Sequence, residues 1–330
     1  MAEARPNRIV YLFGAGATHA ELQNIDPDLI DKNRGLLVSQ LSSRVIERAR
    51  RDPQYLTDDV AMVSGAKGSL NIELLISLIE SSKIPRWEYK ANTLKNLVRE
   101  DIEGILSAQT TNRFYLHRAL LELHNHPATR RKETLTGLIS LNYDDVLDTA
   151  YRQYYGPPRY CFSLDEPLQK DDVPLLKLHG SFNWKKVKIR ERNRDIEIIP
   201  LGSTKNYIHP PYGCIWNQAL QTLIDCDTLR VIGCSLSPND VHLIDLLFKA
   251  HLERGTVFDI EIIATEKVGE EVRWNYGFFP ALKTLTEIEG TLIAEPLPEN
   301  PFKTWLKFKG LKLLGTKKAA GTKYVKKVVK

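Results

Sequence analysis

Four short clusters of small and polar residues follow apolar segments of the chain, and they contain side chains that could do chemistry. They are Gly14–Thr18, Asn142–Asp144, His179–Ser181 and Gly233–Ser235. An imidazole with its ordinary pKa of ~6.5 can accept a proton near neutral pH. A side-chain amide can hold a water or hydroxyl group by hydrogen bonds without changing its own protonation. Glycines let the backbone turn tightly and let an anion approach its N–H groups. A site built from these clusters could bind a phosphate group and transfer a proton.

The first cluster lies between an expected strand and an expected helix. Ile9–Phe13 is a short β-branched and aromatic run, and Gly14-Ala15-Gly16 ends it. A strand that enters a helix through such a turn points backbone N–H groups toward the positive end of the helix dipole, where phosphate binds. The full dinucleotide-binding pattern would have a third glycine where His19 stands. The stretch therefore fits either a phosphate-binding turn or an ordinary strand-to-helix turn.

All four clusters stand at the carboxyl ends of expected parallel strands. Those ends form the edge of the ligand crevice in open parallel sheets, so the clusters could converge on one site. Each cluster also has a simpler structural explanation. Asn142 could cap the helix that follows it, and His179 could be a hydrogen-bonded histidine of the core. The joint placement of the clusters favours a shared site.

In their order along the chain, the clusters resemble the motifs of the sirtuin superfamily. The similarity is closest to the bacterial sirtuin-like NAD hydrolases of anti-phage defence, and it spans most of residues 8–265. The motifs are Gly14-Ala-Gly-Ala-Thr18, Leu141-Asn-Tyr-Asp144, Lys177-Leu-His-Gly-Ser181 and Gly233-Cys-Ser-Leu236. The resemblance implies that NAD is the substrate.

The resemblance also implies roles for individual residues. Asn142 matches the family asparagine that orients the reacting water or hydroxyl beside the nicotinamide ribose, and His179 matches the catalytic histidine. Asp144 matches the acid that contacts the nicotinamide carboxamide. The glycine motif would hold the diphosphate, and Gly233 and Ser235 would close over the adenosine side. The residues implied in NAD binding are Gly14, Ala15, Gly16, Ala17, Thr18, Tyr143, Asp144, Gly180, Ser181, Gly233 and Ser235.

Two features separate the chain from the deacylating sirtuins. Those enzymes usually carry a four-cysteine zinc module, whereas the four cysteines here contain no C-x-x-C pair. The glutamine that precedes their catalytic asparagine is Leu141 in this chain. We therefore expect an NAD hydrolase (an NAD glycohydrolase) that releases nicotinamide and ADP-ribose without a metal. The alternatives are a catalytically silent subunit that senses NAD or another nucleotide, and a protein deacylase.

Unrestrained loss of NAD would kill the host cell, so a toxic effector of this kind needs control. We expect a homo-oligomer, a partner defence protein, or both to supply it. No apolar run approaches the length of a membrane span, and the first eight residues lack the apolar centre of a signal peptide. We therefore expect a cytoplasmic protein without membrane contact.

The elements that must position the clusters follow from the apolar periodicity. Strands are expected at 9–13, 135–141, 173–178, 228–232 and 258–264, and a hairpin over 185–190 and 195–199. Helices are expected to open at 146, to span 216–224 and to start at Pro238. This alternation predicts an α/β fold, with a Rossmann-like parallel sheet and helices on both faces. Helically spaced leucines predict a helical insertion at about 20–130, which could gate the pocket.

Charge divides unevenly along the chain. Residues 303–330 contain ten lysines and no acid, whereas residues 1–302 contain 36 basic and 41 acidic residues, a net charge of −5. We expect one sirtuin-like domain over 1–302 and a basic tail over 303–330. The tail could dock on protein, remain disordered or contact nucleic acid, and the absence of arginine disfavours nucleic acid. We expect His124 and His126 at the surface.

Overall fold

The computed structural model describes residues 5–26, 35–51, 71–108, 115–163, 168–169, 171–184, 188–189, 192–193, 210–238, 240–279, 281–284 and 300–309. One sheet is built from β1 (Asn7–Phe13), β2 (Glu133–Ser140), β3 (Leu175–Lys177), β6 (Thr228–Ile232), β7 (Asp259–Ile263) and β8 (Leu282–Thr284). Its six strands are parallel and lie in the order β3-β2-β1-β6-β7-β8. From β1 the sheet is extended by β2 and β3 on one side, and the later strands β6, β7 and β8 are added on the other side of β1. The direction in which strands are added therefore reverses between β1 and β6. Open α/β sheets bind ligands at such a switch point.

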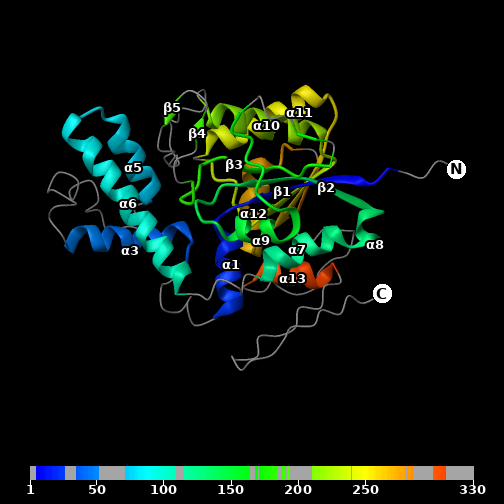
Figure 1. The fold of residues 1–330 in the computed structure, drawn as a ribbon, viewed down its shortest axis with the longest axis horizontal. Helices are drawn as coiled ribbons and strands as arrows, with labels where there is room; N and C mark the ends of the chain where they lie inside the picture. The colour runs from blue at the N-terminus through cyan, green and yellow to red at the C-terminus, as the bar shows by residue number, and fades with distance from the viewer. Residues whose placement is uncertain are drawn as a thin grey trace.

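Helices cover both faces of this sheet. One face carries α10 (Tyr212–Asp225), α11 (Val241–Arg254) and α12 (Glu266–Tyr276). The other carries α1 (Ala15–Ile25), α7 (Tyr115–Asn125), α9 (Val146–Tyr155) and α13 (Pro301–Phe308). The short helix α8 (Pro127–Arg130) leads from α7 into β2. Figure 1 shows the sheet between the helices that cover its two faces, which confirms the predicted α/β fold.

The central strand β1 is buried on both sides because successive side chains point to opposite faces. Val10 and Leu12 pack into the core beneath α10 and α11. Ile9, Tyr11 and Phe13 pack into the core beneath α1, α7 and α9. This double burial explains why residues 9–13 form a continuous apolar run in the sequence instead of an alternating one.

The predicted strands correspond to β1, β2, β3, β6 and β7, with small differences at their ends. Within the first arm of the predicted hairpin, the structure describes β4 (Lys188–Ile189), which pairs antiparallel with β5 (Arg192–Asn193), in the stretch expected to connect the two arms. Residues 195–199 lie outside the described residues. The sixth strand, β8, was not predicted.

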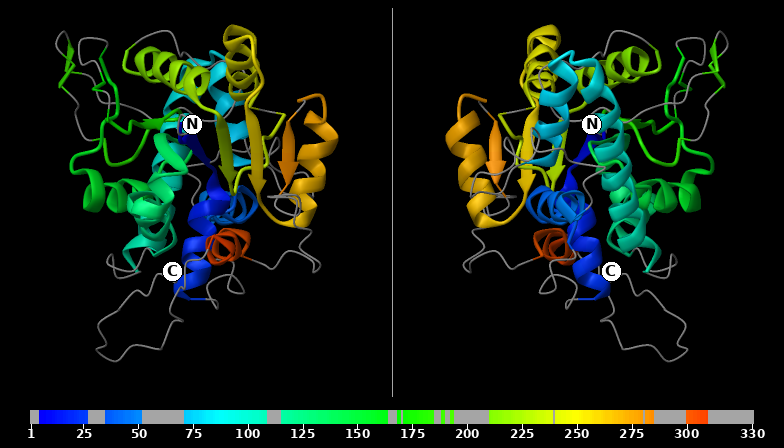
Figure 2. Two further views of the ribbon diagram at one scale, coloured as in Figure 1. Left: turned by 90° about the vertical axis from the view of Figure 1, so that its right-hand side faces the viewer. Right: turned by 90° about the vertical axis from the view of Figure 1, so that its left-hand side faces the viewer.

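Three helices form a layer of their own beside the sheet, as Figures 1 and 2 show. They are α3 (Val38–Arg51), α5 (Ile72–Ser81) and α6 (Pro85–Ser107). Their buried side chains form a separate core, which Leu22 of α1 and Leu36 join. Among the described residues of the insertion expected at about 20–130, this part stands apart from the sheet. Helix α7 instead packs on the sheet through side chains such as Leu116 and Leu120. We call α3, α5 and α6 the helical layer.

Helix α13 belongs to the core of the sheet. Phe302 and Trp305 are 1% and 0% exposed. The Trp305 ring lies edge-on to Tyr11 at 6.0 Å between ring centroids, and the Arg230 guanidinium lies 5.5 Å from the Trp305 ring centre. The boundary expected at residue 303 therefore falls inside a packed helix. The lysines of this segment suggested a tail, but they alternate with aromatic residues, of which Phe302 and Trp305 are buried. Residues 310–330 of the expected tail lie outside the described residues.

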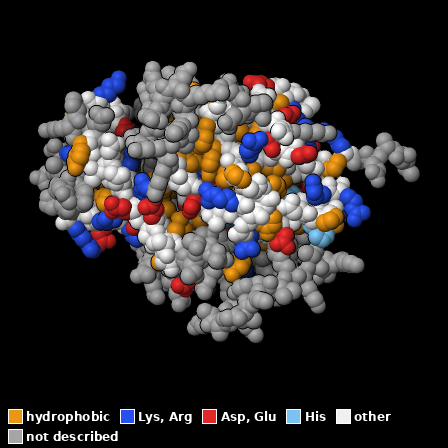
Figure 3. Space-filling view, viewed as in Figure 1, with side chains coloured by type: hydrophobic (Ala, Val, Ile, Leu, Met, Phe, Trp, Pro, Cys, Tyr) orange, Lys and Arg blue, Asp and Glu red, His pale blue; other side chains and the backbone are white. Residues whose placement is uncertain are grey.

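The described surface mixes the two signs of charge. On the face in Figure 3, basic and acidic side chains are interspersed. Within the ranges given above, no helix has the length and apolar character needed to cross a membrane.

We predict that Trp305→Ala lowers the free energy of unfolding by about 3–5 kcal/mol, since a large buried ring leaves a cavity behind. Trp274, which is 89% exposed on α12, provides the matched control. Trp274→Ala should change the free energy of unfolding by no more than about 0.5 kcal/mol. Urea denaturation of both variants checks this, and equal losses would contradict the assignment of α13 to the core.

Candidate functional site

A cavity of about 520 Å³ lies at the carboxyl ends of the strands, over the switch point between β1 and β6. The segments that follow β1, β2, β3, β6 and β7 all contribute to its wall, and so does the helical layer. Its lining includes Gly14, Ala15, Gly16, His19, Asn71, Glu73, Leu141, Asn142, His179, Gly233, Cys234, Ser235, Asp240 and Thr265. All four sequence clusters therefore reach one cavity, although not every member of each cluster lines it.

The cavity floor is made by two glycine turns that touch each other. Gly16 N donates to Gly233 O at 2.8 Å, and Gly14 N donates to Ile232 O at 3.0 Å. Gly233 has φ of +62°, and a Cβ there would lie 2.1 Å from Ala17 N. These positions thus need glycine because the two backbone segments approach each other too closely to leave room for a Cβ.

Three N–H groups of the first turn donate within the protein, including that of Ala17, which donates to Gly14 O at 2.9 Å. Those three groups are engaged and cannot also be the phosphate donors that the sequence suggested. A phosphate at this turn would depend instead on the positive end of the dipole of α1, which starts at Ala15.

Asn142 is fixed by hydrogen bonds from its amide nitrogen. Nδ2 donates to Gly14 O and to Thr18 Oγ1, each at 3.0 Å. The Thr18 hydroxyl in turn donates to Asp144 Oδ2 at 2.9 Å, and Asp144 Oδ1 accepts from Val146 N at 3.0 Å. Since both hydrogens of the amide nitrogen are engaged, Asn142 Oδ1 is the atom of this amide that can accept a hydrogen bond from a ligand.

This network gives Asp144 a different place from the one its motif implied. Both carboxylate oxygens bind protein groups, and Asp144 stands behind the cavity wall, not on it. Asp144, and not Asn142, holds the free N–H at the start of α9. Asn142 thus lines the cavity, and Asp144 holds the Asn142 amide in place through the Thr18 hydroxyl.

Other predicted binding residues also lie behind the cavity wall. Ala17 is buried in the core, and the Ser181 hydroxyl donates to Tyr143 O at 3.1 Å. Gly180 has φ of +83° in the turn that follows β3. The predicted residues that line the cavity are Gly14, Ala15, Gly16, Asn142, His179, Gly233 and Ser235, and those behind its wall are Ala17, Thr18, Tyr143, Asp144, Gly180 and Ser181.

His179 follows β3 and is almost completely buried. Its Nε2 lies 3.2 Å from Asp240 Oδ2, and the two side chains are 2% and 3% exposed. The Tyr143 ring lies 6.3 Å from the imidazole, centroid to centroid. Burial, with Glu73 as the next contributor, raises the pKa of Tyr143 well above its ordinary value. Tyr143 is therefore neutral beside the histidine at physiological pH.

A buried ion pair supports the segment between β2 and α9. Lys177 Nζ lies 3.0 Å from Asp148 Oδ2, and both side chains are inaccessible to solvent. The same ammonium donates to Asp144 O. Asp148 also accepts from the Tyr160 hydroxyl and from Asn183 Nδ2. Lys177, which belongs to the His179 motif, thus ties the end of β3 to the segment that carries Asn142.

Several cavity residues were not predicted as site residues. Asp240 lies in the segment from Pro238 that was predicted only as a helix start, and Asn71 and Glu73 lie at the start of α5 in the helical layer. The sequence offers one signal for Asp240, since an acidic residue in the segment after the Gly233 cluster must lie near that cluster. It offers no comparable signal for Glu73, whose position depends on how the helical layer packs. His19, in place of the third glycine, also lines the cavity, and burial lowers its pKa.

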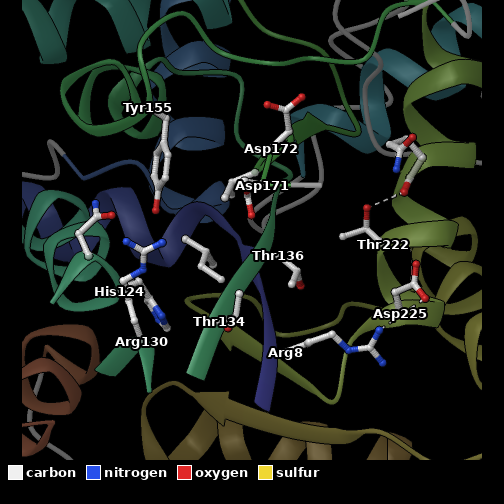
Figure 4. Close-up of a pocket in the computed structure, with 14 residues that line it drawn as sticks. Arg8, His124, Arg130, Thr134, Thr136, Tyr155, Asp171, Asp172, Thr222 and Asp225 are labelled. Carbon is white, nitrogen blue, oxygen red and sulfur yellow. Dashed lines mark hydrogen bonds and ion pairs between the residues drawn. The ribbon is translucent and has the colours of Figure 1, made fainter. Parts of the chain in front are cut away.

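A second cavity, of about 530 Å³, lies at the opposite end of the sheet, where β1 and β2 begin (Figure 4). Two of its carboxylates are in ion pairs, Asp225 with Arg8 at 3.7 Å and Asp172 with Arg159 at 2.8 Å. His124 is 4% exposed, so its expected surface position is wrong. Its Nε2 lies 2.7 Å from the Tyr11 hydroxyl, and burial, followed by Arg230, lowers its pKa to about 4. We therefore place the candidate site at the switch point and not here.

Comparison with known proteins identifies the region that carries most of the site. A family model described as the SIR2-like domain matches residues 136–265, which include the Asn142, His179 and Gly233 clusters. No curated protein matches the chain. In the part of the chain that the structure describes, no group of three or more histidine, cysteine, aspartate or glutamate side chains could hold a metal ion.

Solved structures of sirtuins align with most of the chain. A Sir2 structure with a p53 peptide and NAD+ shares 13% identity over 84% of this chain and 87% of that chain, with a TM-score of 0.37. A structure titled for the basis of sirtuin substrate affinity shares 14% identity over 92% and 93% of the two chains, with a TM-score of 0.39.

The contact between the two glycine turns generates a stability prediction. Gly233→Ala should lower the free energy of unfolding by about 1–3 kcal/mol more than Gly255→Ala. Both glycines have similar positive φ, +62° and +68°, but a Cβ at Gly255 would meet no atom within 4 Å. The Gly255 variant therefore reports backbone strain alone, about 1–2 kcal/mol. Chemical denaturation measures both, and equal losses would show that the close approach is unimportant.

Proposed function

We propose that the chain is an NAD hydrolase that cleaves the bond between nicotinamide and ribose. The observation that supports this most is the meeting of Asn142 and His179, which come from separate strand ends, in one cavity at the switch point. Both residues lie in the region that matches the SIR2-like domain. An imidazole and an oriented amide are the two groups that the reaction needs.

The chemistry follows from the leaving group. Nicotinamide departs as a neutral ring, so it needs no protonation, and the ribose carbon becomes oxocarbenium-like, as in glycoside cleavage. The C1′–N bond breaks, a C1′–O bond to water forms, and His179 accepts the proton that the water loses. Asn142 Oδ1 would hold the water or a ribose hydroxyl by accepting its hydrogen bond. The products are nicotinamide and ADP-ribose.

The cavity suits a dinucleotide. Its volume of about 520 Å³ lies in the usual range for ligand sites. The diphosphate would lie at the start of α1 near Ala15 and Gly16, and the adenosine side near Gly233 and Ser235. Asn71 and Glu73 of the helical layer would close the remaining side, which limits access of bulk water to the reacting carbon.

Hydrolysis is a better proposal than protein deacylation for this site. Leu141 stands where the deacylating sirtuins have a glutamine, and it packs against the hydrophobic core beside the cavity. The cysteine spacing also lacks the zinc module of those enzymes. In addition, the helical layer takes part in the cavity wall.

We further propose a biological role as an NAD-depleting effector of anti-phage defence in the cytoplasm. The support is the motif resemblance and the toxicity of unrestrained NAD loss. The activity would then be restrained until a change of oligomeric state or a partner protein releases it. A purified monomer with full activity would contradict this part of the proposal.

The proposed reaction predicts that NAD yields free nicotinamide without any acylated peptide, and that Asn142→Ala and His179→Ala each reduce the rate at least about 100-fold. The control is Asn92→Ala, which removes an exposed amide within α6. Nicotinamide release is followed chromatographically, with and without an acylated peptide, across the oligomeric states separated by gel filtration.

Each outcome separates the candidates. Release without peptide that both site variants lose supports the hydrolase. Tight NAD binding without turnover in every oligomeric state would instead support a silent nucleotide sensor. Release that requires the acylated peptide would support a deacylase.

A further inference from the structure

Asp240 is the residue directly before α11, but its side chain does not cap the helix. Aspartate at this position usually accepts a hydrogen bond from the second or third N–H of its helix. Here the side chain makes no such bond, and Asp240 Oδ2 lies 3.2 Å from His179 Nε2. The carboxylate therefore lies beside the imidazole and not at the N–H groups of its own helix.

The backbone holds Asp240 firmly in this position. Its N–H donates to Ser237 O at 2.9 Å, and its C=O accepts from Leu243 N at 3.0 Å. Leu243 and Leu247 anchor the first turns of α11 in the core. The carboxylate is thus presented from the end of a rigid, packed element, as a positioning group requires.

We propose that Asp240 is the positioning residue of His179. A carboxylate beside Nε2 favours the tautomer with its proton on that nitrogen, which makes Nδ1 the basic nitrogen of the ring. The same negative charge stabilises the imidazolium that forms after proton transfer. Its catalytic consequence rests on the proposed hydrolysis of NAD, whereas its effect on the imidazole does not.

Other ionisable groups face His179, but with different relations to it. Tyr143 contacts the ring from the segment after β2 and is neutral, and Glu73 of α5 acts on Tyr143. Lys177 precedes the histidine by two residues and is paired with Asp148. His19 lines the same cavity from α1. Asp240 places a carboxylate oxygen 3.2 Å from Nε2 of the ring.

The first test is a titration of the histidines by NMR in the full-length protein, with His179 assigned by its loss in His179→Gln. Asp240→Asn should lower the pKa of His179 by about one pH unit or more, since an opposite charge at this distance favours the protonated ring. The nitrogen shifts should also show that the Nε2–H tautomer loses its predominance. Asp245→Asn is the matched control, since Asp245 is half-exposed on the same helix and pairs with Lys249.

The second test is kinetic. Asp240→Asn should lower kcat by between about 10-fold and 10⁴-fold, the range that positioned proton transfer supplies, with little change in KM. The acid limb of the pH profile should move to lower pH, since the neutral imidazole then persists further into acid. Asp240→Ser repeats both measurements with a residue that can cap α11, so it separates the lost charge from any loss of helix stability.

The outcomes keep the two proposals apart. An unchanged pKa and tautomer of His179 in both Asp240 variants would overturn the positioning role, whatever the activity. A shifted pKa in a protein that never hydrolyses NAD would support the positioning role and reject the proposed function. A fall in kcat for Asp245→Asn equal to that of Asp240→Asn would also overturn the inference.

Discussion

The arrangement of the site depends on the contact between two glycine turns at the centre of the sheet. Gly14 and Gly16 leave β1 directly against Gly233, which follows β6, with backbone atoms at hydrogen-bond distance. A side chain on any of the three would separate the turns. Because β1 and β6 flank the switch point, this contact fixes the place where the segments after the other strands must meet.

Two sets of polar contacts then hold the cavity residues in place. Thr18 and Asp144 hold the amide of Asn142, and Lys177 holds the backbone of Asp144 from the adjacent strand. Buried polar groups cost free energy unless they are paired, and these groups are paired with one another. The residues that the motifs present as one binding set thus divide into those that line the cavity and those that hold them in place.

The sequence was informative where a residue's neighbours along the chain determine its environment. Buried strands such as 9–13 are continuous apolar runs, and their ends locate the polar clusters. Three features required knowledge of packing. Lysines of residues 303–309 hid the burial of Trp305, and His124 falls on the buried stripe of α7, seven residues after His117. The carboxylate of Asp240 has two possible uses, cap or histidine partner, and only the fold decides between them.

The helical layer has a hydrophobic core distinct from the cores of the sheet, yet it supplies Asn71 and Glu73 to the cavity wall. Any molecule that fills the cavity therefore bridges two bodies that could otherwise unfold separately. Occupancy couples their stabilities, since a ligand that needs both walls is released when either melts. A ligand in the cavity should accordingly join the helical layer and the sheet into one cooperative unfolding unit.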